Sequence, residues 1–424
     1  MSIPSRTDDY DVIIIGGGPT GSTAGIRLAR AGLRVLIVER SRFPRFHVGE
    51  SCLPAVLKII LELGLEERFR ALPHVPKFGG EFAFGYDLSD STRFRFADGL
   101  VGGKNDTFNV ERAPFDKMML DGARDAGVEV REGASVTAIQ NLADGDVTVA
   151  VDGQPVSARY VLDASGQSTV LGKHLGTRRT LERHRRVAYF GHFENVKRLE
   201  GADAGHPTVV ICSEGWFWLI PIDPVRTSIG MVLEADIARH VDVPATQMLK
   251  WGIARCPLVR DRTREASCPE KNHVIADYSY SCAPYAGPGY FLAGDSAFFV
   301  DPIFSAGICI GMVTAIDAAD RIRQLIDGTV APATARRRYI KVVRGGSSPL
   351  LRLVDLFYVH SYRELFLQGQ GPFQIHRAVI SVLAGHVFPR PAFALRWRMR
   401  LMELLVFLNR FLPIVPRRRR FSLL

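Results

Sequence analysis

A glycine-rich turn lies between two short hydrophobic segments near the start of this 424-residue chain. Residues 11–15 have the length and composition of a buried strand, and residues 22–32 are typical of a helix. Three glycines lie between them in the spacing GxGxxG: Gly16, Gly18 and Gly21. A second strand at residues 35–38 ends at Glu39. Such glycines let a dinucleotide pyrophosphate approach the helix N-terminus, and the acidic residue binds the ribose. The pattern predicts a Rossmann-like nucleotide site; a glycine-rich turn in an ordinary α/β unit is the alternative.

A different pattern follows in the middle of the chain. Residues 147–151 and 160–163 have strand composition. A series of strands separated by short turns comes next, at residues 208–212, 216–222 and 228–232. Such a series is typical of an antiparallel sheet. A helix is predicted at about 305–327, and the chain beyond residue 331 is mostly helical in pattern. We therefore expect an α/β protein with an antiparallel-sheet substrate domain and a helical C-terminal region.

Composition excludes several classes of protein. The chain is 47% hydrophobic and 23% charged, which fits an ordered globular protein rather than a disordered or collagen-like one. Its six cysteines form no CxxC pair and no Cys/His spacing suited to zinc, so we predict no metal and no disulfide framework. The first residues lack the apolar stretch of a secretory signal, which favours a cytoplasmic location.

The positive charge is concentrated at the C-terminal end. Residues 331–424 contain 17 of the 54 Lys and Arg residues but only 3 of the 44 acidic residues. A basic region attracts acidic partners such as phospholipid, carrier protein or RNA. Its apolar runs are shorter than the roughly 18 residues that cross a bilayer, so at most it lies peripherally on a membrane surface.

The identity of the dinucleotide follows from further motifs. No second GxGxxG occurs, so a single dinucleotide site is expected. Three motifs carry a family resemblance: the GxGxxG turn with Glu39, DASG at 163–166, and Gly294-Asp295 followed by Pro302. Through them the chain resembles the flavoprotein monooxygenase superfamily over about residues 10–325. The resemblance implies bound FAD, with Glu39 on the adenosine ribose and Asp295 on the ribityl chain. It also implies these cofactor-binding residues: Arg45, Val48, Gly49, Arg112, Val136, Asp163, Gly294 and Pro302. For Arg112, a surface ion pair with Asp116 is an equal alternative.

Two local segments point to one branch of this superfamily. Residues 215–221, GWFWLIP, match the GWxWxIP signature of flavin-dependent halogenases. Residues 75–82, VPKFGGEF, resemble the segment of that family that carries its essential lysine, here Lys77. The resemblance implies an enzyme that uses reduced FAD, O2 and chloride or bromide. The alternatives are a tryptophan-rich strand that only packs the core and a lysine that is only solvated.

The chemistry gives these residues separate roles. Oxidation of the halide yields hypohalous acid, a small electrophile that diffuses. A rigid wall of Trp216 and Trp218, in a strand ending at Pro221, would exclude the substrate from the flavin while letting this electrophile pass. Lys77 would hydrogen-bond hypohalous acid or form a haloamine, and so direct the electrophile. Lys77, Trp216, Trp218 and Pro221 are therefore the candidate catalytic residues.

The segments at residues 45–54 and 301–307 should approach the flavin. A helix start binds anions through unpaired N–H groups, so the backbone amides of Ala306 and Gly307 are the candidate halide site. Tryptophan halogenases have a glutamate at this turn, whereas this chain has Phe304 and Ser305. We therefore expect phenols, pyrroles or carrier-bound groups as substrates rather than free tryptophan. For His47 and Glu50 we favour a structural role in which they satisfy one another.

These inferences give a domain scheme and partners. Residues 1–330 would form the FAD-binding, monooxygenase-like core with substrate-domain insertions at about 75–110 and 180–280, and residues 331–424 the basic helical region. A separate flavin reductase would supply FADH2, and no nucleic-acid partner is expected. Arg417–Arg420 could dock an acyl or peptidyl carrier protein, bind anionic lipid, or remain solvated. The competing functions are a flavin-dependent reductase or hydroxylase of an apolar, isoprenoid substrate at a membrane surface, and a noncatalytic flavin-binding scaffold.

Overall fold

The computed structural model describes residues 9–87, 91–103, 105–269, 271–276, 278–369 and 371–424. In it, the glycine-rich turn follows an interior strand, β1, of an eight-stranded sheet. The sheet has the order β18-β19-β10-β1-β2-β7, and β9 and β8 extend it from β10. Strands β19, β10, β1, β2 and β7 run parallel to one another, whereas β18 pairs antiparallel with β19. The strands are β1 (Tyr10–Ile15), β2 (Val35–Glu39), β7 (Glu129–Glu132), β8 (Val136–Ala143), β9 (Asp146–Val151), β10 (Gln154–Asp163), β18 (Ala286–Gly287) and β19 (Tyr290–Leu292). This arrangement confirms the Rossmann-like class.

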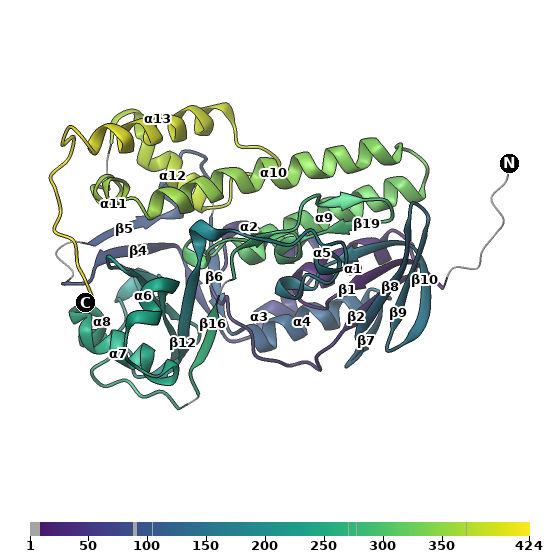
Figure 1. Cartoon of the computed structure of the whole chain (residues 1–424), viewed down its shortest axis with the longest axis horizontal. Helices are drawn as coiled ribbons and strands as arrows, with labels where there is room; N and C mark the ends of the chain where they lie inside the picture. Colours follow the sequence, from purple (N-terminus) through teal and green to yellow (C-terminus); the bar gives the residue numbers. More distant parts are fainter. Residues whose placement is uncertain (1–8, 88–90, 104, 270, 277, 370) are drawn as a thin grey trace.

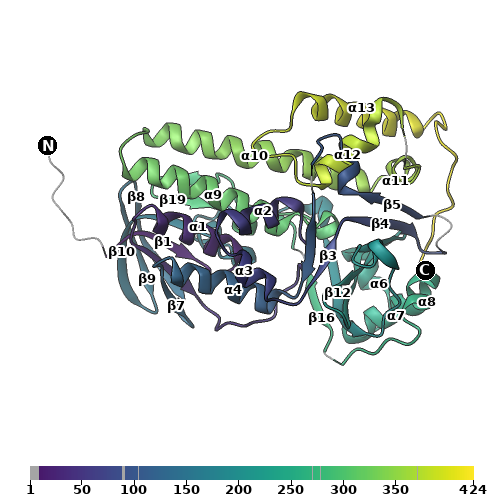
Figure 2. The same cartoon turned by 180° about the vertical axis from the view of Figure 1, so that it is seen from behind.

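Helices pack on this sheet and bring the cofactor turn into place. Helix α1 begins at Pro19, three residues before the predicted start, because a proline at the first helical position is already in helical geometry. Helix α9 runs beside α1, and α10 lies beside α9 (Figures 1 and 2). The helices of this part are α1 (Pro19–Arg30), α2 (Pro54–Glu62), α3 (Glu66–Arg70), α4 (Arg112–Asp125), α5 (Val170–His174) and α9 (Gly307–Ile326).

A second sheet of seven strands forms the other half of the molecule. Its order is β16-β12-β15-β14-β13-β4-β5, and every pairing is antiparallel except that of β13 with β4. The strands are β4 (Gly79–Phe84), β5 (Ser91–Arg95), β12 (Arg186–Glu194), β13 (Thr208–Ile211), β14 (Gly215–Pro221), β15 (Arg226–Glu234) and β16 (His273–Ala276). Strands β3 (His74–Lys77) and β6 (Thr107–Val110) pair separately.

The two faces of the second sheet carry different sets of side chains. Successive residues of a strand point to opposite faces. Trp216, Trp218 and Ile220 join the main hydrophobic core, whereas Phe217 and Leu219 join a smaller core with residues of α7 (Met248–Arg255) and α8 (Pro257–Arg262). The tryptophans therefore face the rest of the protein, not the helices α7 and α8.

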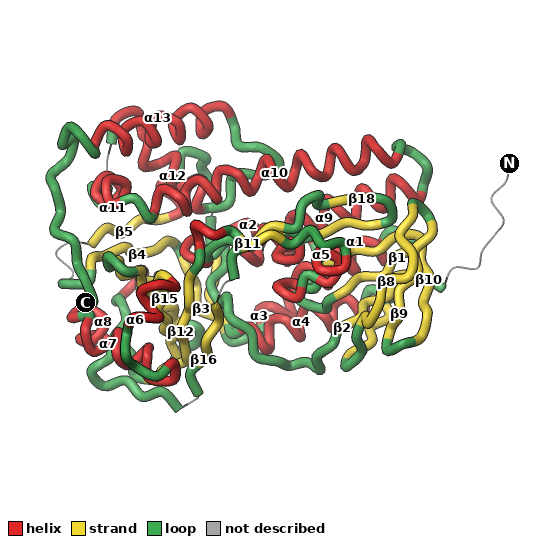
Figure 3. Tube along the Cα trace, in the orientation of Figure 1, coloured by secondary structure: helices red, strands yellow, loops and turns green. Residues whose placement is uncertain are grey.

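The C-terminal part is helical, as predicted. The helices are α10 (Pro332–Phe357), α11 (His360–Phe366), α12 (Ile375–Leu383) and α13 (Phe393–Asn409). Helix α10 runs from beside α9 toward the second sheet, and α11, α12 and α13 lie on the side of β4 and β5 (Figure 3). The tail then descends from α13 to the edge of the second sheet (Figure 1), where the backbone carbonyl of Phe421 accepts the N–H of Ser213. No helix in the described ranges is long and apolar enough to cross a membrane.

Candidate active site

In the glycine turn, one of the three motif glycines has space for a Cβ atom and the other two have none. A Cβ on Gly16, whose φ is +103°, would lie 2.4 Å from the carbonyl oxygen of Ala164, and one on Gly21 would lie 1.9 Å from that of Gly16. Both positions require glycine. At Gly18, the nearest atom to such a Cβ is Nη2 of Arg45, 3.6 Å away. The start of α1 is therefore open on the side where an arginine lies.

Two carboxylates, Glu39 and Asp163, fix this turn and the neighbouring chain by accepting backbone N–H groups. Glu39 is buried at the end of β2, and its oxygens accept the N–H groups of Gly17 and Ser41, each at 2.8 Å. The carboxylate of Asp163 accepts the N–H groups of Ser165 and Leu171, at 2.9 and 2.8 Å. Asp163 thus fixes the chain against which Gly16 packs. The N–H of Ala134, two residues before Val136, bonds to the carbonyl of Glu39 and brings that segment beside it.

Arg112 is buried and reaches the segment predicted to pass the flavin. Its guanidinium pairs with Asp116 at 2.7 and 2.9 Å and donates to the carbonyl of Val48 at 2.8 Å. Arg45 also contacts Asp116, at 3.1 Å. Next to Val48, Gly49 has a φ of +106°, a conformation that favours glycine. The arginine is therefore part of a buried network and not a surface ion pair.

Asp295 is a half-buried carboxylate to which no described residue donates a hydrogen bond. Loss of hydration raises its pKa to about 6, although the nearby Arg112 opposes the shift. Its Oδ1 lies 3.8 Å from where a Cβ of Gly307 would be, and the adjacent Gly294 packs against Thr20. The helix starts of α1 and α9 meet here. An unpartnered carboxylate, an open helix start and flanking arginines fit FAD, with Glu39 and Asp295 available for its hydroxyls and α1 for its pyrophosphate.

Lys77, the last residue of β3, is buried inside the protein. Its Nζ donates to Oγ of Ser51 at 2.8 Å and to the carbonyl of Cys52 at 3.0 Å, and lies over the ring of Phe96. Burial lowers its pKa to about 8. An ammonium has three N–H groups, and oxygen atoms of the described residues accept two of them, so the third has no oxygen acceptor in the described ranges. A solvated surface lysine is thus excluded.

The lowered pKa of Lys77 predicts a pH-dependent stability. The unfolded chain binds this proton with the ordinary pKa of 10.5, whereas the folded protein holds it with a pKa of about 8. Unfolding therefore takes up a proton between these pH values, and stability rises with pH by up to about 3 kcal/mol. In denaturant unfolding from pH 7 to 11, wild type should gain this amount relative to Lys77→Met. If the free energy of unfolding changes with pH in the same way for both proteins, the lowered pKa of Lys77 is contradicted.

The two indoles lie side by side on the inner face of the second sheet. Their ring centroids are 5.7 Å apart, and both side chains are buried. Trp218 donates its N–H to Oγ of Ser228 at 3.1 Å. Trp216 donates to the hydroxyl of Tyr358 at 2.9 Å, and this hydroxyl donates to Oδ2 of Asp301 at 2.7 Å. The tryptophan face is therefore connected to the predicted halide turn.

The segment at residues 45–54 meets the same face of the sheet. His192 of β12 shares that face, since it aligns through Ser228 with Ile220, and its Nε2 lies 3.0 Å from Oε1 of Glu50. The other oxygen of Glu50 accepts the N–H of Gly49. The expected pairing of His47 with Glu50 is therefore wrong, because Glu50 reaches across to the second sheet.

The predicted halide turn leads directly into α9. Asp301 accepts the N–H of Ile303 at 3.0 Å, and Pro302 opens a short helical turn. Ser305 then adopts the left-handed conformation, with a φ of +54°, and Ala306 is the residue before the first residue of α9, Gly307. The first N–H groups of a helix have no acceptor within it. This turn can therefore present amides to an anion.

Comparisons with known proteins agree with this geometry. The sequence matches the family described as FAD binding domain over residues 9–337. It is 32% identical over 397 residues, covering 91% of this chain and 94% of the relative, to a 1H-pyrrole-2-carbonyl-peptidyl-carrier-protein brominase of Pseudoalteromonas luteoviolacea (strain 2ta16). The chain belongs to the flavin-dependent halogenases. FAD is accordingly its cofactor, and a halide and O2 are consumed.

Further similarities bear on the family and the fold. The halogenase is 32% identical over 383 residues, 86% of its chain and 70% of the relative, to a tryptophan 2-halogenase of Chondromyces crocatus. Its structure is similar to that of the flavin-dependent brominase Bmp2, with a TM-score of 0.83 and 29% identity over 93% of this chain and 98% of that one. These similarities show the family and the fold, and the substrate has to be argued from the site.

Tyr358 connects Trp216 with Asp301, a link that the sequence does not reveal, and we expect it to position both residues. Tyr358→Phe removes the acceptor of the Trp216 indole N–H and the hydroxyl that donates to Oδ2 of Asp301, at a cost of about 1–3 kcal/mol. We expect the KM for halide to rise about fivefold, as the Asp301–Gly307 turn loses its support. The control is Tyr362→Phe, because the buried hydroxyl of Tyr362 has no partner in the described part of the chain. Equal effects of both substitutions would contradict this role.

Proposed function

We propose that the halogenase oxidises chloride or bromide to hypohalous acid and, directed by Lys77, halogenates an electron-rich ring tethered to a carrier protein in secondary metabolism. The observation that carries the proposal is the buried ammonium of Lys77, with one N–H that has no oxygen acceptor in the described ranges, in a protein whose paired indoles face its interior. The relative that acts on a pyrrole bound to a carrier protein supports the substrate class. A phenolic ring would be open to the same electrophilic chemistry.

Each part of the site contributes one function. Bound reduced FAD, supplied by a separate flavin reductase, provides with O2 the two-electron oxidation of the halide. The amides of Ala306 and Gly307 hold the halide at the start of α9. Trp216 and Trp218 exclude the bulky substrate and leave a passage for the smaller oxidant. Pro221 contributes no reactive group and ends the strand that carries them.

Lys77 acts on the oxygen–halogen bond of hypohalous acid. Its N–H donates to the oxygen of hypohalous acid, which polarises the oxygen–halogen bond and fixes the direction of the halogen. The ring carbon takes the halogen, that bond breaks, and the oxygen leaves as water once the ring has lost its proton. The neighbours Ser51 and Cys52 hold the ammonium in place. A lysine buried in this way loses little entropy when it engages the oxidant.

The test supplies the holoenzyme with FADH2 from a flavin reductase, O2 and bromide or chloride. The substrates are pyrrole-2-carbonyl carrier protein, free pyrrole-2-carboxylate, a phenol and tryptophan, and mass spectrometry identifies the products. We expect halogenation of the carrier-bound pyrrole and little of free tryptophan. Hydroxylation or NADPH-linked saturation without halide incorporation would overturn the proposal in favour of a hydroxylase or reductase.

A further inference from the structure

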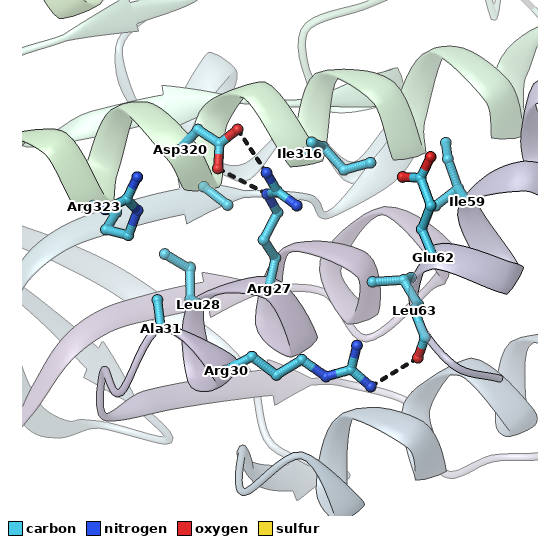
Figure 4. A pocket seen from close by; sticks show the side chains of 11 residues that line it. Arg27, Leu28, Arg30, Ala31, Ile59, Glu62, Leu63, Ile316, Asp320 and Arg323 are labelled. Carbon is cyan, nitrogen blue, oxygen red and sulfur yellow. Dashed lines mark hydrogen bonds and ion pairs between the residues drawn. The ribbon is translucent and has the colours of Figure 1, made fainter.

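Two cavities are lined by arginines and include none of the proposed FAD-binding residues, but they differ in whether their arginines already have partners. The first, of about 240 Å³, lies between α1, α2 and α9. Figure 4 shows Arg27 forming two hydrogen bonds with Asp320, and Arg30 bonded to the carbonyl of Leu63. Its arginines are already engaged within the protein. The second cavity, of about 410 Å³, lies between α11 and the tail after α13.

The second cavity has an excess of positive charge. It is lined by Arg410, Arg417, Arg418 and Arg420 around a single carboxylate, Glu364; we call this the arginine pocket. Glu364 is buried and fully used, since it accepts hydrogen bonds from Arg417 at 3.0 Å, from Asn409 at 3.0 Å and from the N–H of Arg418 at 3.1 Å. The guanidinium groups of Arg410 and Arg420 have no acceptor within the described ranges. These two charges remain available for an anion.

An apolar rim adjoins the arginine pocket at the end of α13. Phe407, Phe411, Leu412 and Ile414 are 54%, 71%, 65% and 46% exposed. Soluble proteins rarely expose large apolar side chains side by side unless the surface binds something. A partner suited to this surface has an anionic group for the pocket and apolar side chains for the rim.

The arginine pocket adjoins the active site along the chain. Its wall includes His360, two residues after Tyr358, whose hydroxyl accepts the indole N–H of Trp216. Two residues span at most about 7 Å of backbone. The ring of His360 also lies 6.2 Å from that of Phe84 in β4. A partner at the arginine pocket is therefore held next to the elements that carry the indoles.

We propose that the arginine pocket docks an acidic carrier protein and binds the phosphate that joins the substrate-bearing arm to it, a proposal that rests on the proposed function. Carrier proteins present their acyl groups on an arm linked through a phosphodiester. Arginine is suited to this anion, because its planar guanidinium donates two parallel hydrogen bonds. The combination of free arginines and an adjoining apolar rim favours this partner, because an acidic carrier protein presents both a phosphodiester and apolar side chains around it.

The charge-reversal variant is Arg410→Glu with Arg420→Glu, since neither guanidinium supports a contact in the fold. Arg417 is left intact because it neutralises the buried Glu364. The control reverses the same number of charges at Arg337 and Arg338, exposed residues of α10 at the other end of the molecule. The substrates are pyrrolyl carrier protein and a pyrrolyl pantetheine thioester that lacks both phosphate and carrier.

At low salt, the variant should raise the KM for pyrrolyl carrier protein at least about tenfold. Its kcat and its KM for the short thioester should stay unchanged. The control variant should keep the wild-type KM for both substrates. An unchanged KM for the carrier substrate overturns the docking proposal. So does loss of binding to phosphatidylglycerol vesicles with no change in that KM, which would make the surface a lipid site. If wild type halogenates neither substrate, the proposed function itself has failed.

Discussion

Lys77→Ala should abolish halogenation while FAD binding and flavin oxidation continue. The residues proposed to contact the cofactor are Glu39, Arg112 and Asp295. None of them has a hydrogen bond or ion pair with Lys77, so the oxidant should still form. Without the ammonium, nothing holds or polarises hypohalous acid beside the substrate. Loss of one fixed donor in an active site typically costs 10²–10³-fold in rate, and we expect product formation to fall by at least about 100-fold.

The measurement compares product formed with FADH2 oxidised in the same reaction. Lys77→Ala should release hypohalous acid or hydrogen peroxide in place of product. Lys117→Ala is the control, because Lys117 lies on the exposed side of α4 in an ion pair with Asp121. Wild-type product yield from Lys77→Ala would remove this lysine from the mechanism, and loss of flavin oxidation would place it at the cofactor.

The features that the sequence predicted well are encoded in neighbouring residues. The glycine turn, the alternation in GWFWLIP and the helical pattern after residue 331 each depend on a short stretch, and the fold class and family inferred from them are confirmed. The sequence did not reveal the surroundings of these residues. Lys77 is held by Ser51, 26 residues earlier, and Trp216 by Tyr358, 142 residues later. Only the folded topology brings such pairs together.

The basic tail shows a second feature that the sequence alone could not predict, namely which of its arginines are free. A run of four arginines, Arg417–Arg420, is indistinguishable in sequence from a solvated charge cluster. In the structure these residues differ: Arg417 neutralises buried Glu364, and Arg419 lies over the ring of Tyr86, whereas Arg420 faces the cavity. Replacing all four together would therefore mix loss of folding with loss of binding. The contacts that each guanidinium makes in the fold, which charge patterning does not encode, decide which arginine can serve a partner.

Trp218→Ala should change which product forms, and not only how much. The ring of Trp218 lies against Gly230, where a Cβ would come within 2.1 Å of it, and 5.8 Å from the ring of Phe190. Its removal opens the inner face of the sheet at the place where the proposed wall excludes the substrate. We expect halogenated product to fall about tenfold or more and oxygenated product or hydrogen peroxide to rise. The cavity should also cost about 3–5 kcal/mol in stability.

Loss of stability alone could lower activity, so the control has to create a similar cavity elsewhere. Phe217→Ala does so: Phe217 is the preceding residue of β14, is fully buried and packs in the smaller core on the opposite face. Both variants should therefore unfold at lower denaturant concentrations than wild type. Only Trp218→Ala should shift the ratio of halogenated to oxygenated product. If the two variants give the same ratio, the paired indoles do not separate the substrate from the flavin.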